Sequence, residues 1–274
     1  MNISVIVTTY NRPESLKKVL EGLLQQIVLP KEIIVADDGS TDETSRMIAQ
    51  MAESSLDCPI HHVRHEDLGF RAAEIRNKAI LKSSGDYIIS LDGDCIPDRH
   101  FIQDHLQLAK PGYFFQGKRV LVEKALQDAF NFPHTQKILW LIFNALKGQI
   151  SNAHHLIRLP FVPTVTTTKM SGIRSCNMGF FKKDLFAVNG FNQAFQGWGR
   201  EDSELAVRLY NYGLKRREHP FMAVCFHLWH EENDRTNLEK NDQLLKEVMD
   251  AGLYRCAEGL VADSVEERTN NQNF

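Results

Sequence analysis

The chain has 274 residues, which is enough for one large domain or two small ones with a substantial hydrophobic core. Its 32 Lys and Arg residues nearly balance 35 Asp and Glu residues, and a net charge of -3 gives no positive field that would hold nucleic-acid phosphates. A hydrophobic fraction of 43% with 24% charged residues is typical of a globular protein. We therefore expect a folded protein with no nucleic-acid partner.

Five cysteines lie far apart without a CxxC pair, which favours reduced thiols in the cytoplasm over a disulfide framework or a zinc knuckle. The first residues, MNISVIVTTYNRP, have no basic region before a short apolar run, so they predict a buried strand and no signal peptide. The most apolar window, residues 138–146, is less than half as long as a transmembrane helix. A cytoplasmic location without a transmembrane helix is expected.

The first hundred residues alternate strand and helix signals. Apolar residues between Leu16 and Leu24 recur at the spacing of one helix face. Alternating strands and helices predict a mostly parallel sheet with helices on both faces and a ligand beyond the carboxyl ends of the strands. Strands are expected at residues 3–7, 32–36, 60–63 and 87–91, and helices from Pro13, from Thr41 or Asp42, and over 71–82.

After residue 100 the pattern is weaker. Strands are predicted at residues 113–122, 178–181 and 223–228, and a helix is predicted at 201–212. The aromatic stretch 125–159 has no clear assignment. Its segment 138–146 is interpreted as a core or lid helix, or as an interfacial helix that meets a lipid-linked acceptor, and the first interpretation is favoured. The polar end from residue 258 is expected to fray.

Two acidic turns follow predicted strands. Asp92 and Asp94, with Gly93 between them, could present carboxylate oxygens to one hard cation, although a plain Asp-Gly turn is the alternative. Asp37 and Asp38 follow another strand of the same sheet. Two acidic turns at one sheet edge are electrostatically costly without a cation or hydrogen-bond donors, which favours a functional site.

The turn after the first strand carries hydroxyl and cationic side chains: Thr8, Tyr10 and Arg12. Such groups at a helix N-terminus suit a nucleotide or its phosphates, and an ordinary polar loop is the alternative. Arg76, on the helix after Gly69, adds positive charge at this edge unless it faces solvent. Neither a P-loop nor a dinucleotide fingerprint is present.

Four segments, TTYNRP (8–13), ADDGS (36–40), GFRAAEIRN (69–77) and LDGDC (91–95), occur in an order that resembles glycosyltransferase family 2, the nucleotide-sugar-dependent enzymes with the GT-A fold. By this resemblance Asp38, with Asp37, accepts from the uracil imide, and Arg76 holds the nucleotide. Asp92 and Asp94 serve the ribose, the pyrophosphate and the metal. The implied donor-binding residues are Thr8, Tyr10, Arg12, Asp37, Asp38, Arg76, Asp92 and Gly93.

Residues 191–209, FNQAFQGWGREDSELAVRL, are similar to the carboxyl-terminal half of β-1,4-galactosyltransferases, polypeptide N-acetylgalactosaminyltransferases and chondroitin-type polymerases. The similarity implies that Trp198 and Gly199 bind the acceptor sugar, that Glu201 contacts the acceptor, and that Asp202 is the general base. A glycine-flanked indole in a mobile loop and acids fixed by a following helix fit these roles. Alternatively, both acids merely stabilise the helix N-terminus.

A histidine completes the implied metal site. Related enzymes take a histidine from the region of segment FHLWH (226–230), and His230 is preferred because the predicted strand ends there. His227 is the alternative. A strand's period of two places residues three apart on opposite faces, so only one ring is expected at the site.

These features predict an α/β protein with the GT-A fold, a Rossmann-like, mostly parallel central sheet flanked by helices. One domain is expected over residues 1–257, with a nucleotide-binding half (1–100), an acceptor-binding half (101–257), and a disordered tail (258–274). The implied reaction moves a sugar from a UDP-sugar to a hydroxyl of a glycan or glycolipid acceptor. Mn²⁺ or Mg²⁺ is the implied cofactor, held by Asp92, Asp94 and His230.

Inversion at the anomeric carbon and a place in cell-surface polysaccharide or lipopolysaccharide synthesis follow from the resemblance, with peripheral contact at the inner membrane face. The N-acetylgalactosaminyltransferases that share the later segment retain configuration, so retention is the alternative. A sugar-nucleotide pyrophosphorylase is a rival, but its usual GxGTR-type loop is replaced here by TTYNRP. A non-catalytic module that binds a nucleotide-sugar is the other rival.

Overall fold

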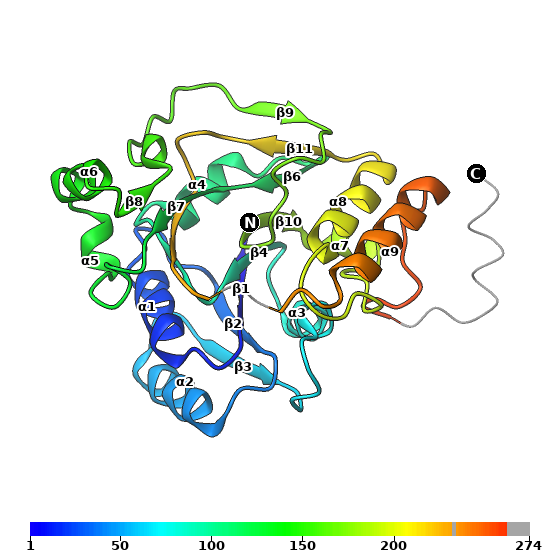
Figure 1. Ribbon diagram of the computed structural model, residues 1–274, viewed down its shortest axis with the longest axis horizontal. Helices are drawn as coiled ribbons and strands as arrows, with labels where there is room; N and C mark the ends of the chain where they lie inside the picture. The colour runs from blue at the N-terminus through cyan, green and yellow to red at the C-terminus, as the bar shows by residue number, and fades with distance from the viewer. Residues whose placement is uncertain (232–233, 262–274) are drawn as a thin grey trace.

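The computed structural model describes residues 1–231 and 234–261 (Figure 1). In this part of the chain an eight-stranded sheet has the order β3-β2-β1-β4-β10-β6-β11-β9, and a second, four-stranded sheet has the order β5-β12-β7-β8. The strands are β1 (Ile3–Thr9), β2 (Glu32–Asp37), β3 (Ile60–Arg64), β4 (Tyr87–Asp92), β5 (Cys95–Pro97), β6 (Tyr113–Gln116), β7 (Lys118–Val122), β8 (Ile150–Ser151), β9 (Val165–Thr167), β10 (Asn177–Phe181), β11 (Lys215–Glu218) and β12 (Val224–Leu228).

The α-helices are α1 (Pro13–Leu24), α2 (Asp42–Ser54), α3 (Ala72–Lys82), α4 (Phe101–Leu108), α5 (Phe132–Thr135), α6 (Ile138–Leu146), α7 (Lys182–Ala187), α8 (Glu201–Asn211) and α9 (Leu238–Ala251). A short 3₁₀ turn, η1 (Ala153–His155), follows β8. The strands and helices predicted for the first hundred residues are confirmed.

Strands β3, β2, β1 and β4 are mutually parallel, as the alternating pattern predicts. The register places Thr8 opposite Asp92 and Thr9 opposite Asp37. Since parallel strands end at one edge of the sheet, the polar turns after β1, β2 and β4 lie together.

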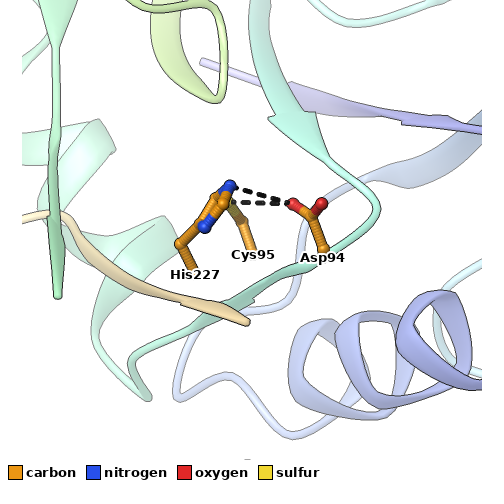
Figure 2. Close-up of side chains that lie close together, drawn as sticks. All are labelled: Asp94, Cys95 and His227. Carbon is orange, nitrogen blue, oxygen red and sulfur yellow. Dashed lines mark hydrogen bonds and ion pairs between the residues drawn. The ribbon is translucent and has the colours of Figure 1, made fainter. Parts of the chain in front are cut away.

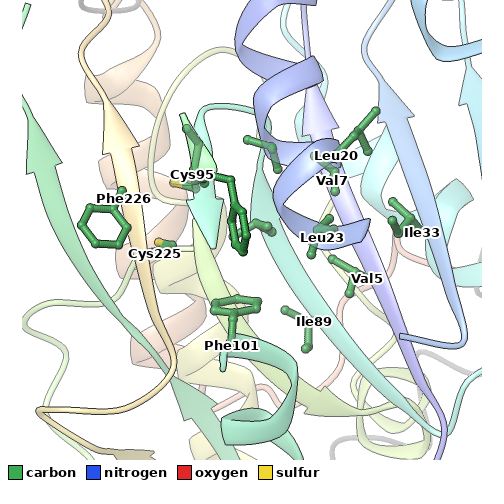
Figure 3. Close-up of a cluster of buried hydrophobic side chains, with 14 of the residues drawn as sticks. Val5, Val7, Leu20, Leu23, Ile33, Ile89, Cys95, Phe101, Cys225 and Phe226 are labelled. Atoms are coloured by element: carbon green, nitrogen blue, oxygen red, sulfur yellow. The ribbon is translucent and has the colours of Figure 1, made fainter. Parts of the chain in front are cut away.

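Helices cover both faces of the large sheet. Val5 and Val7 on β1 point to the side covered by α1 and α2, whereas Ile6 points to the side covered by α3, α7 and α8. The alternation follows from the period of two along a strand. Figure 3 shows the first of these clusters, where Leu20 and Leu23 of α1 pack on the sheet.

The second half of the sheet differs from the prediction. β10 runs antiparallel to both β4 and β6, so the parallel arrangement ends at β4. The strand predicted at 113–122 is two strands in different sheets, β6 and β7, separated at Gly117. A Cβ at Gly117 would lie 2.2 Å from Nδ2 of Asn177, which donates hydrogen bonds to the carbonyls of Lys118 and Ala223. The chain therefore changes sheets where only glycine fits beside a buried amide.

The aromatic stretch that the pattern leaves unassigned contains α5, α6, β8 and η1. Helix α6 is not a core helix, because only Leu141 and Asn144 are buried in it while Leu139 and Leu146 are 81% and 84% exposed. Helix α6 is therefore a surface helix that packs on the core along one side only. No helix in the described ranges is both long and apolar enough to cross a bilayer.

The predicted tail begins too early. Leu260 is 7% exposed and packs in the cluster under α3, α7 and α8, and its amide donates to the carbonyl of Asn189. The amide of Gln193 donates to the carbonyl of Glu258. Residues 258–261 are thus fixed to the folded domain, with Leu260 in its core, and the rest of the predicted tail lies outside the described residues. The five cysteines are free and buried.

A buried arginine joins the first half of the chain to the second. Arg76 on α3 is 4% exposed, and its Nε donates to the hydroxyl of Thr8 at 3.1 Å. Its Nη1 lies 3.0 Å from Glu201 on α8, and its Nη2 lies 3.4 Å from Asp92 after β4. A buried cation is tolerated only when charged partners replace water, so these contacts fix α8 against the parallel strands.

Replacement of Leu260 by alanine tests whether the chain end belongs to the core. We expect Leu260→Ala to lower the free energy of unfolding by about 2–4 kcal/mol, because the truncation leaves a cavity among buried side chains. The neighbouring control Val261→Ala removes a side chain that is 54% exposed and should cost under ~1 kcal/mol. Equal effects of the two substitutions in urea unfolding would contradict this packing.

A double-mutant cycle tests the Arg76–Glu201 contact. Because the two side chains are only 5% and 12% exposed, Arg76→Met and Glu201→Gln should show a coupling energy of about 1–3 kcal/mol in denaturant unfolding. The matched control is the pair Arg200–Asp242, whose side chains are 43% and 48% exposed and whose coupling should stay below ~1 kcal/mol. A coupling as small as that of the exposed pair would refute the joining role of Arg76.

Candidate active site

A cavity of about 670 Å³ opens at the carboxyl ends of β1 and β4. It is the place where an open α/β sheet is expected to bind its ligand. Both halves of the chain contribute to its wall. The predicted site residues that line it are Thr8, Tyr10, Arg12, Asp38, Arg76, Asp92, Gly93, Asp94, Trp198, Gly199, Glu201, Asp202, His227 and His230.

The two aspartates after β2 have different surroundings. Asp37 is fully buried and does not line the cavity; it accepts from the amide of Ser40 at 2.8 Å and from His62 at 2.9 Å. The position of Asp37 gives no support to the expectation that it shares in donor binding, since its contacts hold the turn instead. Asp38 lines the cavity and accepts from the amide of Arg71 and from His65. Burial raises the pKa of Asp38.

The turn after β1 is held in place by polar contacts on either side. The amide of Asn11 donates to Oγ of Ser40, and Oδ1 of Asn11 accepts from the amide of Thr41. Asn11 has a positive φ of 50°, a conformation that asparagine tolerates better than most residues. Tyr10 is 43% exposed and donates from its hydroxyl to Asp67. The loop that would meet a nucleotide is therefore pre-formed.

Asp94, Cys95 and His227 each place a ligand atom within 4.8 Å of the others (Figure 2). His230 joins them, because its Nε2 lies 3.5 Å from Asp94 and Nε2 of His227 lies 3.6 Å from the same carboxylate. The expectation that only one ring faces the site is wrong. β12 ends at Leu228, so the period of two no longer applies when the chain reaches His230.

The protonation states in this group suit a divalent cation. Nδ1 of His230 lies 2.7 Å from the carbonyl of Glu231 and donates to it, which leaves the lone pair on Nε2 toward Asp94. Burial lowers the pKa of His227 and raises the pKa of the Cys95 thiol, so the imidazole is neutral and the thiol stays protonated. One carboxylate and two imidazoles form a donor set that fits Mn²⁺.

Asp92 is separate from that group. Its Oδ1 faces Arg76, and burial raises its pKa to about 6, an effect that the Arg76 charge opposes. Asp92 therefore lines the cavity without joining the ligand cluster of Asp94. Arg12 contacts Asp94 at 3.0 Å and lies on the same wall. A cation bound at Asp94 would compete with this arginine for the carboxylate.

Glu201 and Asp202 begin helix α8 and face the cavity. Burial and the nearby carboxylate of Glu201 together raise the pKa of Asp202 to about 6, although the amides of Ser203 and Ser175 oppose the shift by donating hydrogen bonds. A carboxylate with such a pKa is ionised at neutral pH and can accept a proton from a hydroxyl. The helix dipole also stabilises both negative charges at this position.

The loop with Trp198 is held by α9. Asn241 donates from Nδ2 to the carbonyls of Gln196 and Gly199, and the guanidinium of Arg235 lies 5.0 Å from the centre of the Trp198 ring. Gly199 has φ of 104°, in the region that favours glycine. The indole thus borders the cavity on a supported loop, where it offers an apolar face.

Several residues that line the cavity could not be identified from motifs or periodicity in the sequence. Arg119 on β7 lines the cavity 4.0 Å from the sulfur of Cys176, and Ser175 provides the amide that contacts Asp202. Both lie in segments of weak periodicity. Cys95, next to the acidic turn, is recognisable only once β12 pairs with β5 and brings His227 opposite it.

The sequence matches two families. Residues 4–158 match glycosyl transferase family 2, and residues 163–231 match a family described as the N-terminal domain of galactosyltransferase. The boundary between the matches separates the acidic turns from the Gly-Trp-Gly loop. This division agrees with the two resemblances seen in the motifs.

Curated relatives include the hyaluronan synthase of Pasteurella multocida, 30% identical over 227 residues, which cover 78% of this chain and 23% of that protein. The chondroitin synthase of Escherichia coli is 28% identical over 234 residues, which cover 77% of this chain and 32% of that protein. Validoxylamine A glucosyltransferase of Streptomyces hygroscopicus subsp. limoneus is 29% identical over 235 residues, 77% of this chain and 48% of that protein. The chain thus spans less than half of each.

Solved structures show the same fold at low identity. S. aureus TarS 1–349 in complex with UDP-GlcNAc has a TM-score of 0.64 and 17% identity, covering 98% of this chain and 70% of that one. The mannosyltransferase PcManGT from Pyrobaculum calidifontis, in complex with GDP-Man and Mn²⁺, has a TM-score of 0.55 and 20% identity. The match covers 92% of this chain and 62% of that one. The expected GT-A fold is confirmed. Since the family 2 match extends over more than half of its residues, the chain belongs to glycosyltransferase family 2.

Proposed function

We propose that the protein is a metal-dependent, inverting glycosyltransferase that moves a sugar from a UDP-sugar to a hydroxyl of a glycan or glycolipid acceptor. The observation that carries the proposal is the cavity in which the acidic turn of β4, two histidines and the acid pair of α8 meet. The polysaccharide synthases among the relatives support a role in cell-surface polysaccharide or lipopolysaccharide synthesis.

The donor would lie along the edge formed by β1, β2 and β4. Asp38 accepts from the uracil imide, and Thr8 and Tyr10 border the nucleoside. Gly93 allows the chain to bend against β1, since a Cβ there would lie 2.9 Å from the carbonyl of Thr8. The UDP complex of the structurally similar TarS supports a uridine nucleotide.

Asp94, His227 and His230 would hold the divalent cation, Mn²⁺ or Mg²⁺. When bound, the ion supplies Lewis-acid neutralisation of the negative charge on the leaving diphosphate. Arg12, released from Asp94, adds a guanidinium for the same phosphates. Asp92, paired with Arg76, accepts from a ribose or sugar hydroxyl at the side of the ion.

The acceptor would lie between Trp198 and the start of α8. The indole packs on the apolar face of the acceptor sugar beside Gly199, and Glu201 accepts from one of its hydroxyls. Asp202 takes the proton of the attacking hydroxyl, because its hydrogen bonds to the Ser175 and Ser203 amides fix its orientation. Attack opposite the leaving UDP inverts the anomeric carbon.

Removal of each imidazole tests the cation site. His227→Ala and His230→Ala should each weaken Mn²⁺ binding by at least about tenfold in titration calorimetry, because each removes one of three ligands. The control His154→Ala changes an exposed histidine that does not line the cavity and should leave the affinity unchanged. Unchanged Mn²⁺ affinity in both test variants would refute this donor set.

The pH dependence of transfer tests the base. Because Asp202 has a pKa raised to about 6, its carboxylate is progressively protonated below that pH, and kcat/KM should fall about tenfold per unit there. Asp202→Asn should reduce UDP release in the presence of acceptor by at least about a thousandfold while leaving UDP affinity nearly intact. Transfer that survives in the amide variant would show that another group is the base.

A further inference from the structure

Helix α6 presents an apolar stripe to solvent, which we call the α6 face. It consists of Ile138, Leu139, Ile142, Phe143 and Leu146, spaced so that all lie on one side of the helix. Their exposed fractions run from 40% for Ile138 to 84% for Leu146. An apolar face of this extent is uncommon on a monomer and marks an interaction site.

The opposite side of the helix is anchored, so the stripe does not arise from a loosely packed segment. Leu141 is 1% exposed and belongs to the main core cluster. Asn144 is buried and donates to the carbonyl of Trp140, whose ring packs near Phe130. The helix is therefore a rigid support that directs its apolar side chains outward.

A second exposed aromatic residue follows α6 in the sequence. Phe161 is 80% exposed, yet the chain is held on both sides of it. Arg158 contacts Asp104 at 2.6 Å, and His219 donates to the carbonyl of Val162 at 2.7 Å. A phenylalanine exposed on a fixed loop can enter an apolar environment without a large loss of backbone entropy.

The charged residues of the surrounding sequence have one sign. Between Asp128 and Asp184 the sequence contains no aspartate or glutamate but seven lysines and arginines. Lys137 and Lys147, at the two ends of α6, are exposed. Basic residues beside exposed apolar side chains complement an anionic lipid surface, which offers phosphate to the amines and acyl chains to the leucines.

The α6 face has a fixed relation to the cavity. α6 leads into β8, and β8 lies two strand spacings, about 10 Å, from β12, which carries His227. No residue of α6 lines the cavity. In Figure 1, α6 lies at the end of the molecule away from α8 and α9.

We propose that the α6 face is a docking surface for an anionic lipid bilayer. The helix lies in the headgroup region with its leucines among the acyl chains, and Lys137 and Lys147 contact the lipid phosphates. Docking in this way holds the cavity at a set distance from the bilayer, where a membrane-attached acceptor would be present. The surface does not depend on the identity of the donor or the metal.

Vesicle binding by the full chain tests the proposal. The wild-type protein should cosediment with vesicles of phosphatidylcholine containing roughly one third phosphatidylglycerol, and at least about tenfold more weakly with pure phosphatidylcholine. Raising the salt to about 0.5 M should weaken binding to the mixed vesicles, because the lysines contribute through screened charge. Failure to bind the mixed vesicles overturns the proposal.

Two leucine-to-aspartate substitutions test whether vesicle binding depends on the α6 face or only on the net charge of the protein. Leu139→Asp should reduce vesicle binding at least about tenfold, because a carboxylate is costly in the acyl region and repels the lipid phosphates. Leu56→Asp makes the same change at a leucine that is 92% exposed, between α2 and β3, and should leave binding unchanged. Equal effects of the two substitutions would contradict the proposal.

Two further measurements distinguish membrane docking from misfolding and from self-association. UDP affinity in the presence of Mn²⁺ should be the same in Leu139→Asp as in wild type, which would show that the variant is folded. If the wild-type protein does not bind UDP, the proposed function is refuted, but the proposed docking surface is not affected. Light scattering should give the same mass for wild type and variant. A wild-type dimer that Leu139→Asp dissociates would assign the α6 face to a second copy and overturn membrane docking.

Discussion

The buried guanidinium of Arg76 is the interaction on which the arrangement of the cavity depends. It contacts Thr8 from β1, Asp92 from the end of β4, and Glu201 from the start of α8. Without this cation, the carboxylates of Asp92 and Glu201 would repel each other in a poorly solvated place. Without the carboxylates, the guanidinium would be buried unpaired. The opposite charges therefore offset each other's cost of burial. Arg76 belongs to the segment that matches glycosyl transferase family 2 and Glu201 to the segment that matches the galactosyltransferase domain, so the two segments meet at this contact.

The same electrostatics distinguish the carboxylates of the cavity. Burial raises the pKa values of Asp92 and Asp202 to about 6, whereas Asp94 contacts Arg12 and lies beside the imidazoles of His227 and His230. Asp94 is therefore the carboxylate best placed to meet a divalent cation. Asp202 is ionised at neutral pH but has an appreciable proton affinity, which is what a base needs. The proposed metal ligand and the proposed base thus differ in their electrostatic surroundings although they line the same cavity.

Local patterns predict much of the first half of the chain. Periodicity and the polar turns locate β1 to β4 and α1 to α3, and parallel pairing brings the turns to one edge. Long-range contacts decide what the patterns miss. Asp37 and Asp38 are adjacent in sequence, but only pairing with β3 shows that His62 contacts Asp37. The two histidines could not be placed together, because the end of β12 is set by its neighbours β5 and β7.

The second half has weaker signals because its strands are short and change sheets. Gly117 divides one apolar run between two sheets to accommodate Asn177, a contact across about sixty residues. Helix α9 supports the Trp198 loop through Asn241, although its own sequence has no link to that loop. Motif resemblance was more informative than periodicity here, since the Gly-Trp-Gly segment identified the cavity wall around Glu201 and Asp202.

Pulsed electron paramagnetic resonance of the protein with Mn²⁺ and UDP tests the central claim most directly. Two imidazoles at the ion should give nitrogen couplings from His227 and His230, and the diphosphate of UDP should give phosphorus coupling to the same Mn²⁺. Both couplings in one sample would place the nucleotide and the histidines at a single cation beside Asp94. A spectrum that shows phosphorus coupling without nitrogen coupling would contradict the claim that the histidines bind the ion. The spectrum of hydrated Mn²⁺ alone would contradict the claim that the protein holds the ion and UDP together.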